Sequence, residues 1–316
     1  MTVAVIGAGV AGAAAARRLR ASGLGVVVFD KGRGPGGRTA TRRRDDLAFD
    51  HGAPWAADPS GPRPHVPFTA MLNEAVHTGT AVRWQGPEGP TTVGLPGMSA
   101  LVRGMLAEVD VRCGVEVDAV EREPEGWRLG AVRGEGAGGF SAVLVTVPAP
   151  QCATLLQGAH PGLAAVARDA RMDPTWTLML AAEGVADAMV GVGSDALGGE
   201  GIATLVNNGA KPGRDARTLV AHATPEWTRS RLEDEPERVC DDLAAVVRRR
   251  LALPQPVRAT AHRWRYARVA AAAKEGPSFD PETGLGIAGD WTVGPTLADA
   301  HAGGIALADA VLAARG

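Results

Sequence analysis

Three glycines close to the N-terminus have the spacing of a turn that binds phosphate. The apolar run 3–6 is followed by Gly7, Gly9 and Gly12, and an alanine-rich stretch extends to Ala21. Gly7 permits a tight turn, Gly9 lets the backbone approach a phosphate, and Gly12 lets the next helix pack close to the strand. Free N–H groups at the start of that helix suit a pyrophosphate. The segment therefore predicts a strand, a glycine turn and a helix that hold a dinucleotide.

An acidic residue ends the next apolar run. Asp30 closes the predicted strand 26–30, where its carboxylate can accept hydrogen bonds from an adenosine ribose. A carboxylate at this point repels a 2′-phosphate, so the segment favours FAD or NAD over NADP. The alternative is a structural glycine turn in an α/β protein that binds no nucleotide.

A second glycine-rich loop follows this acid and is expected to lie against an extended dinucleotide. The loop covers residues 31–38, whose glycine density favours neither helix nor strand. Arg38 can balance the pyrophosphate charge or support the rest of the cofactor, and a solvated arginine is the alternative. Lys31 and Arg33 lie near the expected adenosine end. Of the arginines at 42–44, the first can contact the cofactor or solvent, and the other two are expected on a solvated face.

The C-terminal segment repeats the pattern of a strand, a glycine turn and a helix. The run 284–288 is apolar, Gly289-Asp290 forms the turn, and a helix is predicted over 297–314. Gly303-Gly304 allows this helix to pack closely. We expect the chain to return here to the first lobe, with the aspartate bonded to the cofactor and the positive end of the helix, near Leu297, facing it.

Hydrophobic patterning predicts further elements along the chain. Apolar residues at helical spacing predict helices over 98–107 and 236–250. Alternating and buried runs predict strands, with a hairpin tip at 134–139, over 111–120, 127–132, 142–147, 176–182, 202–207 and 261–268. The proline-rich residues 58–67 are expected to form a loop that leaves the first lobe.

Several further segments give the chain a resemblance over nearly its whole length. They are 31–38, 49–53 (Phe-Asp-His-Gly-Ala), 97–101, 147–151, 172–176, 211–214 (Lys-Pro-Gly-Arg) and 289–291 (Gly-Asp-Trp). With the first glycine turn and its acid, they resemble the FAD-binding amine-oxidase-like flavoproteins, and within them the renalase-type branch. The chain departs from that branch at Thr296 and Ala298, where arginine and glutamate are typical, and at Pro54-Trp55, where many relatives have an aromatic pair.

The resemblance implies an α/β fold, with a Rossmann-type FAD-binding lobe plus a smaller α+β substrate lobe that has a mixed or antiparallel sheet. We expect a discontinuous FAD-binding domain of residues 1–60, 92–155 and 278–316, and a substrate domain of residues 61–91 and 156–277. Non-covalent FAD is then expected to contact Gly7, Gly9, Ala11, Gly12, Asp30, Lys31, Arg33, Gly37, Arg38, Val117, Gly289, Asp290 and Leu297.

The activity that the resemblance implies is oxidation of a reduced nicotinamide dinucleotide isomer, with a hydride passed to flavin N5 and dioxygen as the terminal acceptor. A dihydropyridine needs no general base, because loss of hydride gives an aromatic cation directly. Two alternatives stay open. One is an amine or small-molecule oxidase or desaturase of a biosynthetic pathway, and the other is a flavin-binding protein without turnover.

Aromatic and imidazole side chains are the candidates for the pocket walls. Trp55, His222, Tyr266 and Trp291 are selected, and Trp291 is expected nearest the flavin because it adjoins the C-terminal aspartate. For each of the four, ordinary packing in the core or at the surface is the alternative. Lys274, just before the closing strand, is a further candidate for a lysine that faces the flavin.

Charge and composition exclude several classes of partner. The net charge of −2 provides no general attraction to nucleic acid or to an acidic membrane. No apolar run reaches the roughly 18 residues of a membrane span, and no leader precedes the first strand, which together predict a cytoplasmic protein. Cys113, Cys152 and Cys240 are far apart, and no cysteine or histidine motif has metal-ligand spacing, so no metal is expected.

Overall fold

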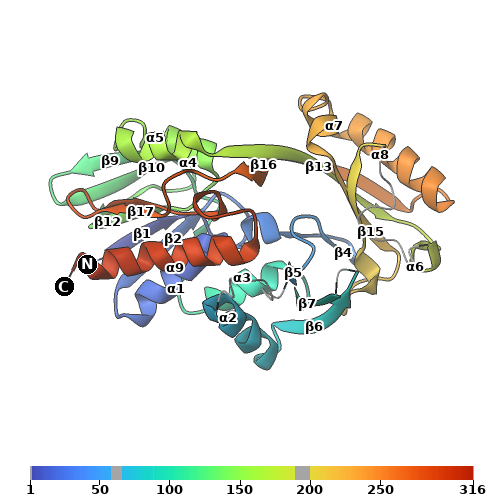
Figure 1. The fold of residues 1–316 in the computed structure, drawn as a ribbon, viewed down its shortest axis with the longest axis horizontal. Helices are drawn as coiled ribbons and strands as arrows, with labels where there is room; N and C mark the ends of the chain where they lie inside the picture. Colours follow the sequence, from blue (N-terminus) through green and yellow to red (C-terminus); the bar gives the residue numbers. More distant parts are fainter. Residues whose placement is uncertain (1, 58–65, 88, 189–199, 316) are drawn as a thin grey trace.

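The computed structural model describes residues 2–57, 66–87, 89–188 and 200–315, which form two lobes (Figure 1). The larger lobe is built on a six-stranded sheet with the order β17-β18-β12-β1-β2-β8, parallel except for its first strand. The strands of this sheet are β1 (Thr2–Ile6), β2 (Gly25–Asp30), β8 (Asp110–Cys113), β12 (Ala142–Val145), β17 (Ser278–Asp280) and β18 (Leu285–Ile287). A parallel sheet has to be covered on both faces, because its strands are apolar throughout.

Two helices from opposite ends of the chain cover one face of this sheet. They are α1 (Val10–Ala21) and α9 (Leu297–Ala313), which lie side by side in Figure 1. A Cβ on Gly304 would lie 2.1 Å from the carbonyl oxygen of Ala11, so the two helices approach closely because this position is glycine. The close packing predicted for Gly303-Gly304 is therefore present. The C-terminal helix thereby supports the helix that follows the glycine turn.

A small antiparallel sheet and two helices cover the other face. They are β9 (Glu116–Glu123), β10 (Gly126–Arg133), β11 (Ala137–Phe140), α4 (Ala149–Leu156) and α5 (Pro161–Asp169). Their apolar side chains, such as Trp127 and Leu163, share one core with Phe29 and Trp291. Residues 161–169, which the sequence assigned to the substrate domain, thus pack against the sheet of the larger lobe.

A third group of elements packs beside α1 and α9. It consists of α2 (Val66–His77), α3 (Ser99–Met105), β5 (Ala56–Ala57), β6 (Ala81–Gly86) and β7 (Gly89–Gly94). Phe68 and Leu72 of α2 and Val93 of β7 belong to the same core cluster as the residues of α1. Residues 66–87, also assigned to the substrate domain, share this core.

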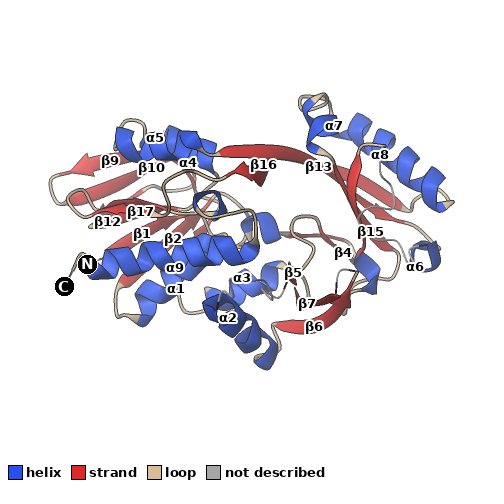
Figure 2. Ribbon diagram, in the orientation of Figure 1, coloured by secondary structure: helices blue, strands red, loops and turns tan. Residues whose placement is uncertain are grey.

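The smaller lobe is a four-stranded antiparallel sheet with the order β14-β15-β13-β16. Its elements are β13 (Arg171–Ala181), α6 (Val185–Ala188), β14 (Ile202–Asn207), β15 (Thr218–Ala223), α7 (Pro225–Arg229), α8 (Pro236–Leu251) and β16 (Arg258–Ala271). Trp176 and Leu178 on one face pack against Leu243 of α8. The long strands β13 and β16 extend from one lobe toward the other (Figure 2).

A hairpin of the larger lobe lies on the other face of this sheet. It consists of β3 (Thr41–Arg44) and β4 (Leu47–Asp50). Leu47 and Phe49 pack against Met179 and Val220, which places the hairpin on the second sheet and joins the lobes. Several of the candidate side chains described below lie along this contact.

The fold class predicted from the sequence is confirmed. The run 111–120 differs from the prediction, because Gly114, with φ of +76°, ends β8 and lets β9 start in another sheet. The predicted hairpin tip at 134–139 is shorter, since β11 begins at Ala137. Most of the predicted loop 58–67 lies outside the described residues. Within the described ranges, no helix is long and apolar enough to cross a membrane.

Candidate active site

The first glycine turn forms an open cradle at the start of α1. Gly7 has φ of +108°, and a Cβ on Gly12 would lie 1.9 Å from the carbonyl oxygen of Gly7. A Cβ on Gly9 would meet no atom within 4 Å, so the space above the helix start is open. No side chain caps α1, and its first turn holds no acidic residue. The helix start, including Ala11, therefore presents N–H groups and positive potential to this space.

The second glycine loop closes one side of this cradle. Gly36 donates its N–H to the carbonyl oxygen of Ala8 at 2.9 Å. Gly37 has φ of +52°, and a Cβ there would lie 3.2 Å from the Cα of Gly9. The structure thus brings the two predicted glycine segments into contact.

Asp30 connects the two glycine segments through its carboxylate. Its Oδ2 accepts the N–H of Ala8 at 2.7 Å, and its Oδ1 accepts the N–H of Gly32 at 2.7 Å. An ionised carboxylate has about four lone-pair directions, so two remain for hydroxyl groups. The half-buried Val117 lies on β9 and packs against the core that contains Phe29 and Trp291. The residue positions near Asp30 therefore agree with an adenosine site.

Lys31 and Arg33 extend from the loop after Asp30 and are exposed. The Nζ of Lys31 lies 3.8 Å from Glu116, and Arg133 donates to the carbonyl oxygen of Lys31 at 2.5 Å. Lys31 is thus placed beside β9 and β10 at the adenosine end.

The C-terminal turn places Asp290 against Arg38. The guanidinium and the carboxylate form two parallel bonds, Nη1–Oδ2 and Nη2–Oδ1, each 2.6 Å long. Nη1 of Arg38 also lies 3.3 Å from the carbonyl oxygen of Ala267 on β16. Gly289 is required before the aspartate, because a Cβ there would lie 2.5 Å from Nε1 of Trp291. Two of the predicted cofactor contacts therefore hold each other in place.

Trp291 itself is fully buried in the core of the larger lobe. Its Nε1 donates to the carbonyl oxygen of Val147 at 3.0 Å. The half-buried Leu297 begins α9 after Thr296, which forms a capping box with Asp299. The carboxylate of Asp299 therefore offsets part of the positive potential at this helix start.

A row of polar side chains crosses the face of the second sheet that looks toward β4. Thr177 on β13 is aligned with His222 on β15 and with His262 on β16. The hydroxyl of Thr177 lies 3.0 Å from Nδ1 of His222. Nη2 of Arg42, on β3, lies 3.2 Å from Nδ1 of His262. Because a guanidinium only donates, this Nδ1 is the acceptor, and His262 is a neutral imidazole with its proton on Nε2.

An aromatic and imidazole cluster continues this row. The rings of His51 and Trp264 stack, with centroids 5.2 Å apart and planes at 29°. His262 meets Trp264 edge to face at 4.5 Å and His51 at 4.9 Å. Nε1 of Trp264 donates to the carbonyl oxygen of His51 at 3.0 Å. Two ring nitrogens, Nδ1 of His51 and Nε2 of His222, are buried without a hydrogen-bond partner among the described residues.

The three imidazoles are held uncharged at neutral pH. Burial lowers the pKa of His51 to about 3, with further contributions from His262 and Arg42. Burial also lowers the pKa of His262 to about 4, assisted by Arg42. The pKa of His222 falls to about 4 through burial and through the positive charges of Lys211 and Arg268. The neighbouring ions that shift these groups are all cations.

The other pocket candidates lie at different distances from this cluster. Tyr266 is half-buried on β16, two residues beyond Trp264, where the register between β13 and β16 shifts. Trp55 packs against the core that contains the residues of α1 and α2, and the centroid of its ring lies 6.0 Å from that of Trp84. Lys274 is 88% exposed beside Asp169, and its role as a flavin-facing lysine stays a prediction.

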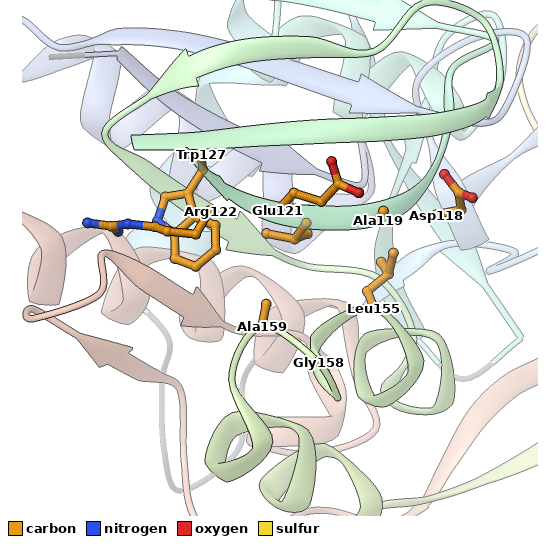
Figure 3. A pocket seen from close by; sticks show the side chains of 9 residues that line it. Asp118, Ala119, Glu121, Arg122, Trp127, Leu155, Gly158 and Ala159 are labelled. Atoms are coloured by element: carbon orange, nitrogen blue, oxygen red, sulfur yellow. The ribbon is translucent and has the colours of Figure 1, made fainter. Parts of the chain in front are cut away.

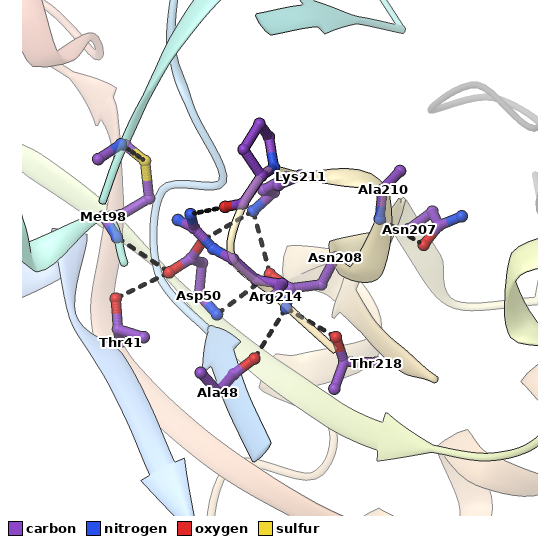
Figure 4. A network of polar contacts seen from close by, with 12 residues as sticks. Thr41, Ala48, Asp50, Met98, Asn207, Asn208, Ala210, Lys211, Arg214 and Thr218 are labelled. Carbon is purple, nitrogen blue, oxygen red and sulfur yellow. Dashed lines mark hydrogen bonds and ion pairs between the residues drawn. The ribbon is translucent and has the colours of Figure 1, made fainter. Parts of the chain in front are cut away.

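A buried ionic cluster near His222 was not predicted from the sequence (Figure 4). Oδ2 of Asp50 lies 3.0 Å from Nζ of Lys211 and 2.8 Å from Nη2 of Arg214, and all three side chains are fully buried. Its Oδ1 accepts the hydroxyl of Thr41 at 2.7 Å and the N–H of Met98 at 3.0 Å. The predicted turn at 211–214 is therefore part of a contact between the lobes.

The charges of this cluster are uneven, with one carboxylate and two cations. Burial raises the pKa of Asp50, but Lys211 and Arg214 outweigh that effect and hold it below its usual range. Burial lowers the pKa of Lys211 to about 8, and Arg214 adds to this by sharing the same carboxylate. A signal was present in the sequence, because Asp50 precedes His51 in the segment 49–53 and the two cations lie in 211–214.

A hollow in the described part of the chain lies away from this region. It measures about 460 Å³ and lies between β9 and the end of α4, lined by residues such as Glu121, Trp127 and Leu155 (Figure 3). It is open to solvent and contains none of the predicted pocket residues. Among the described residues, no three histidine, cysteine or acidic side chains gather as metal ligands.

Comparison with known families identifies the class of protein. Residues 68–312 match the family model for flavin containing amine oxidoreductases, and residues 5–74 match that for NAD(P)-binding Rossmann-like domains. The chain belongs to the flavin-containing amine oxidoreductase family. The chain is therefore an FAD-dependent oxidoreductase.

Solved structures of similar fold cover nearly the whole amine oxidoreductase chain. A triple mutant of putrescine oxidase gives a TM-score of 0.72 at 15% identity over 100% of both chains. A putative protoporphyrinogen oxidase from Exiguobacterium gives 0.66 at 14% identity over 98% of each chain. Cyclohexylamine oxidase from Brevibacterium oxydans also gives a TM-score of 0.66 at 14% identity over 98% of each chain. At such identities, the likeness concerns the fold alone.

A curated relative matches a shorter segment of this amine oxidoreductase. The segment is 48% identical over 52 residues to 4,4'-diapophytoene desaturase (4,4'-diaponeurosporene-forming) of Staphylococcus haemolyticus. It covers 16% of this chain and 10% of the desaturase, so the chain spans only a tenth of that relative.

The residues of this amine oxidoreductase fit FAD, its cofactor. The open space above Gly9 and the uncapped start of α1 suit a pyrophosphate. Asp30 lies at one end of this cradle, and the pair of Arg38 and Asp290 lies on the side of β16. An extended dinucleotide would run between these two ends.

Proposed function

We propose that this amine oxidoreductase oxidises the dihydropyridine ring of a reduced nicotinamide dinucleotide isomer, with dioxygen as terminal acceptor, as in the renalase-type branch. The observation that carries the proposal is the row of three uncharged imidazoles, whose ionic neighbours are cations. Such a face suits a flat, uncharged ring on an anionic nucleotide. FAD, when bound, supplies the group that accepts the hydride.

The aromatic cluster is suited to orient a flat ring. His51 and Trp264 are already stacked, and the hydrogen bond from Trp264 to the carbonyl oxygen of His51 fixes their relative position. The buried nitrogens without partners, on His51 and His222, can bond to an amide group such as the carboxamide of nicotinamide. A buried polar atom without a partner costs about 1–3 kcal/mol, which such a bond would recover.

No group on this face has to act as a general base. A dihydropyridine that loses a hydride becomes aromatic without losing a proton, so neutral imidazoles serve for binding alone. His51 and His222 have pKa values of about 3 and 4, and therefore keep one charge state above pH 6. Orientation of the ring and exclusion of water are the contributions expected of these residues.

An amine oxidase is the second candidate, because the family and the fold relatives include oxidases of amines. An ammonium substrate would meet the positive potential of Arg42, Lys211 and Arg268. The buried carboxylates of Asp50 and Asp290 are engaged by arginines. The charge of the face therefore favours the dihydronicotinamide over the amine.

Anaerobic reduction of the bound flavin tests the proposal directly. We expect dihydronicotinamide isomers to bleach the visible absorption of oxidised flavin, while putrescine and cyclohexylamine do not. The rate is expected to stay constant from about pH 6 to 7, since the imidazoles stay neutral there and Lys211, whose pKa is about 8, keeps its charge. Bleaching by the amines alone, with a rate that rises with pH as the amine loses its proton, would establish the second candidate instead.

Variants of the row make the test specific to these residues. Trp264→Phe keeps a ring but loses the hydrogen bond to His51, so slower bleaching is expected without loss of bound flavin. Leu243→Ala, in the core under α8 on the opposite face of the sheet, serves as the control. If the flavin of Trp264→Phe is bleached as fast as that of Leu243→Ala and of wild type, the aromatic cluster does not orient the substrate.

A further inference from the structure

We propose that Arg42, together with Arg33 and Arg44, forms a subsite for the phosphate groups of the substrate nucleotide. This inference rests on the proposed function, because it assigns the part of the substrate that lies outside the ring pocket. The three arginines come from two segments, the loop after β2 and the strand β3.

The geometry of β3 turns two of these arginines toward the second sheet. Successive side chains of a strand point to opposite faces. Thr41 bonds to Asp50 and accepts the N–H of Ser99 at the start of α3, so Thr41 and Arg43 share that face. Arg42 and Arg44 share the other face, and the bond from Arg42 to His262 shows that this face looks toward β16. The subsite therefore begins at the edge of the imidazole row.

The carboxylates of the same hairpin are directed elsewhere. Asp45, in the turn between β3 and β4, pairs with Arg258 at 2.7 Å. Asp46, beside it, lies 3.5 Å from Arg217. The arginines of β3 are therefore not paired with Asp45 and Asp46, the acidic residues that follow them in sequence.

Within the described ranges, Arg33, Arg42 and Arg44 have no carboxylate within 4 Å, in contrast to Arg17 and Arg249 on the outer surface. Arg42 is half-buried, and its pKa is lowered by that burial and by the charges of Arg33 and Arg44. Arg33 and Arg44 therefore both repel the guanidinium of Arg42. An anion between them would remove the repulsion and accept several charge-assisted hydrogen bonds.

Phosphate is the anion that this arrangement suits best. Guanidiniums present paired donors that match phosphate oxygens, and a nucleotide carries its phosphates at one end of a flat ring and sugar. A ring held by His51 and Trp264 would leave its sugar and phosphate at the side of the pocket marked by Arg42. The substrate dinucleotide and FAD both carry a pyrophosphate, so either could supply the anion. Arg42 bonds to a residue of the substrate sheet, whereas Arg38 bonds to Asp290 beside the glycine cradle, which favours the substrate.

Substrate truncation tests the subsite in the flavin-loaded enzyme. The substrates are dihydronicotinamide riboside, its mononucleotide and its dinucleotide, compared with wild type, Arg42→Gln, Arg44→Gln and Arg33→Gln. We expect kcat/KM for the dinucleotide to fall about ten- to hundredfold in Arg42→Gln, in line with the loss of charged hydrogen bonds. Arg44→Gln and Arg33→Gln, which leave His262 untouched, are expected to lose about three- to tenfold. For the riboside, Arg44→Gln should match wild type within about twofold.

Arg18→Gln is the matched control, because Arg18 is an exposed arginine on α1 that pairs with Asp309. It should leave all three kcat/KM values unchanged. Raising the salt concentration should reduce the preference of wild type for the dinucleotide, since exposed charges are screened. Equal losses for riboside and dinucleotide in Arg44→Gln would overturn the subsite.

Calorimetric titration with ADP separates this inference from the proposed function. ADP should bind the flavin-loaded wild type and bind about tenfold more weakly to Arg42→Gln and Arg44→Gln. If ADP behaves so while no dihydronicotinamide reduces the flavin, the subsite stands and the proposed function fails. If the variants instead lose FAD while ADP binding is unchanged, the arginines serve the cofactor and the substrate subsite is wrong.

Discussion

Arg38 and Asp290, 252 residues apart in sequence, form a bidentate ion pair with two N–O distances of 2.6 Å. The carboxylate is only 8% exposed, and its Oδ1 also accepts the N–H of Trp291 at 2.9 Å. The pair joins the second glycine loop to the turn before α9. It thereby connects the two ends of the chain at the place where the cofactor is expected.

Replacing this carboxylate should weaken FAD binding. Asp290→Asn keeps the shape but gives Arg38 a single neutral acceptor, so the guanidinium is no longer held by two charged bonds. We expect the dissociation constant of FAD to rise about ten- to hundredfold, measured by titration of the apoprotein with FAD. Asp309→Asn, which breaks an exposed pair with Arg18, should retain FAD like wild type. Equal flavin content in both purified variants would contradict the prediction.

The buried carboxylate of Asp50 should be among the most sensitive positions for stability. Asp50→Asn leaves Lys211 and Arg214 as buried cations without a counter-charge, which costs about 3–5 kcal/mol in the free energy of unfolding. Lys211→Met should cost less, because Arg214 still neutralises the carboxylate. Urea unfolding measures both variants. The comparison is Asp173→Asn, which breaks a half-exposed pair with Arg229 and should cost at most about 1 kcal/mol.

Local patterns in the sequence predicted the elements around the first glycine turn. The run 3–6, the spacing of Gly7 to Gly12 and the acid at the end of the next strand define β1, α1 and β2 within a few residues. The periodic runs that became α8 and α9 were predicted for the same reason, since the signal lies within one element. The cofactor class also followed from this short segment.

Contacts between distant segments could not be predicted in the same way. Asp50 and Lys211 are 161 residues apart, and nothing near either residue specifies the other. His51, His262 and Trp264 meet only because the β3–β4 hairpin lies on the second sheet. Trp291 is adjacent to Asp290 in sequence, yet its side chain turns into the core and bonds to Val147. Direction of a side chain at a turn depends on packing that a single sequence does not express.

The three neutral imidazoles should make the fold sensitive to mild acid. In the unfolded chain a histidine takes up a proton below about pH 6.5, whereas His222 in the native state does so only near pH 4. Between these values the unfolded state binds more protons, so the free energy of unfolding falls as the pH falls. His222→Asn keeps a partner for Thr177 and should reduce the slope by up to about 1.4 kcal/mol per pH unit in this window.

Urea unfolding between pH 4 and 7 measures this slope. Leu243→Ala, which lowers stability without removing an imidazole, should keep the slope of wild type. A slope in His222→Asn equal to that of wild type would mean that folding does not lower the pKa of His222.

Alanine substitutions at two glycines should change the stability in opposite directions, because only Gly304 lies where α1 and α9 approach closely. Gly304→Ala places a Cβ 2.1 Å from the carbonyl oxygen of Ala11, so the helices must separate at a cost of about 1–3 kcal/mol. Gly104→Ala, inside α3, places its Cβ 3.5 Å from Thr80, an ordinary contact, and should stabilise by about 0.5–1 kcal/mol through helix propensity. Thermal unfolding gives the sign of each change. Since α1 carries the glycine cradle at its start, Gly304→Ala should also weaken FAD binding. A lower Tm with unchanged FAD affinity would show that the cradle is positioned independently of α9.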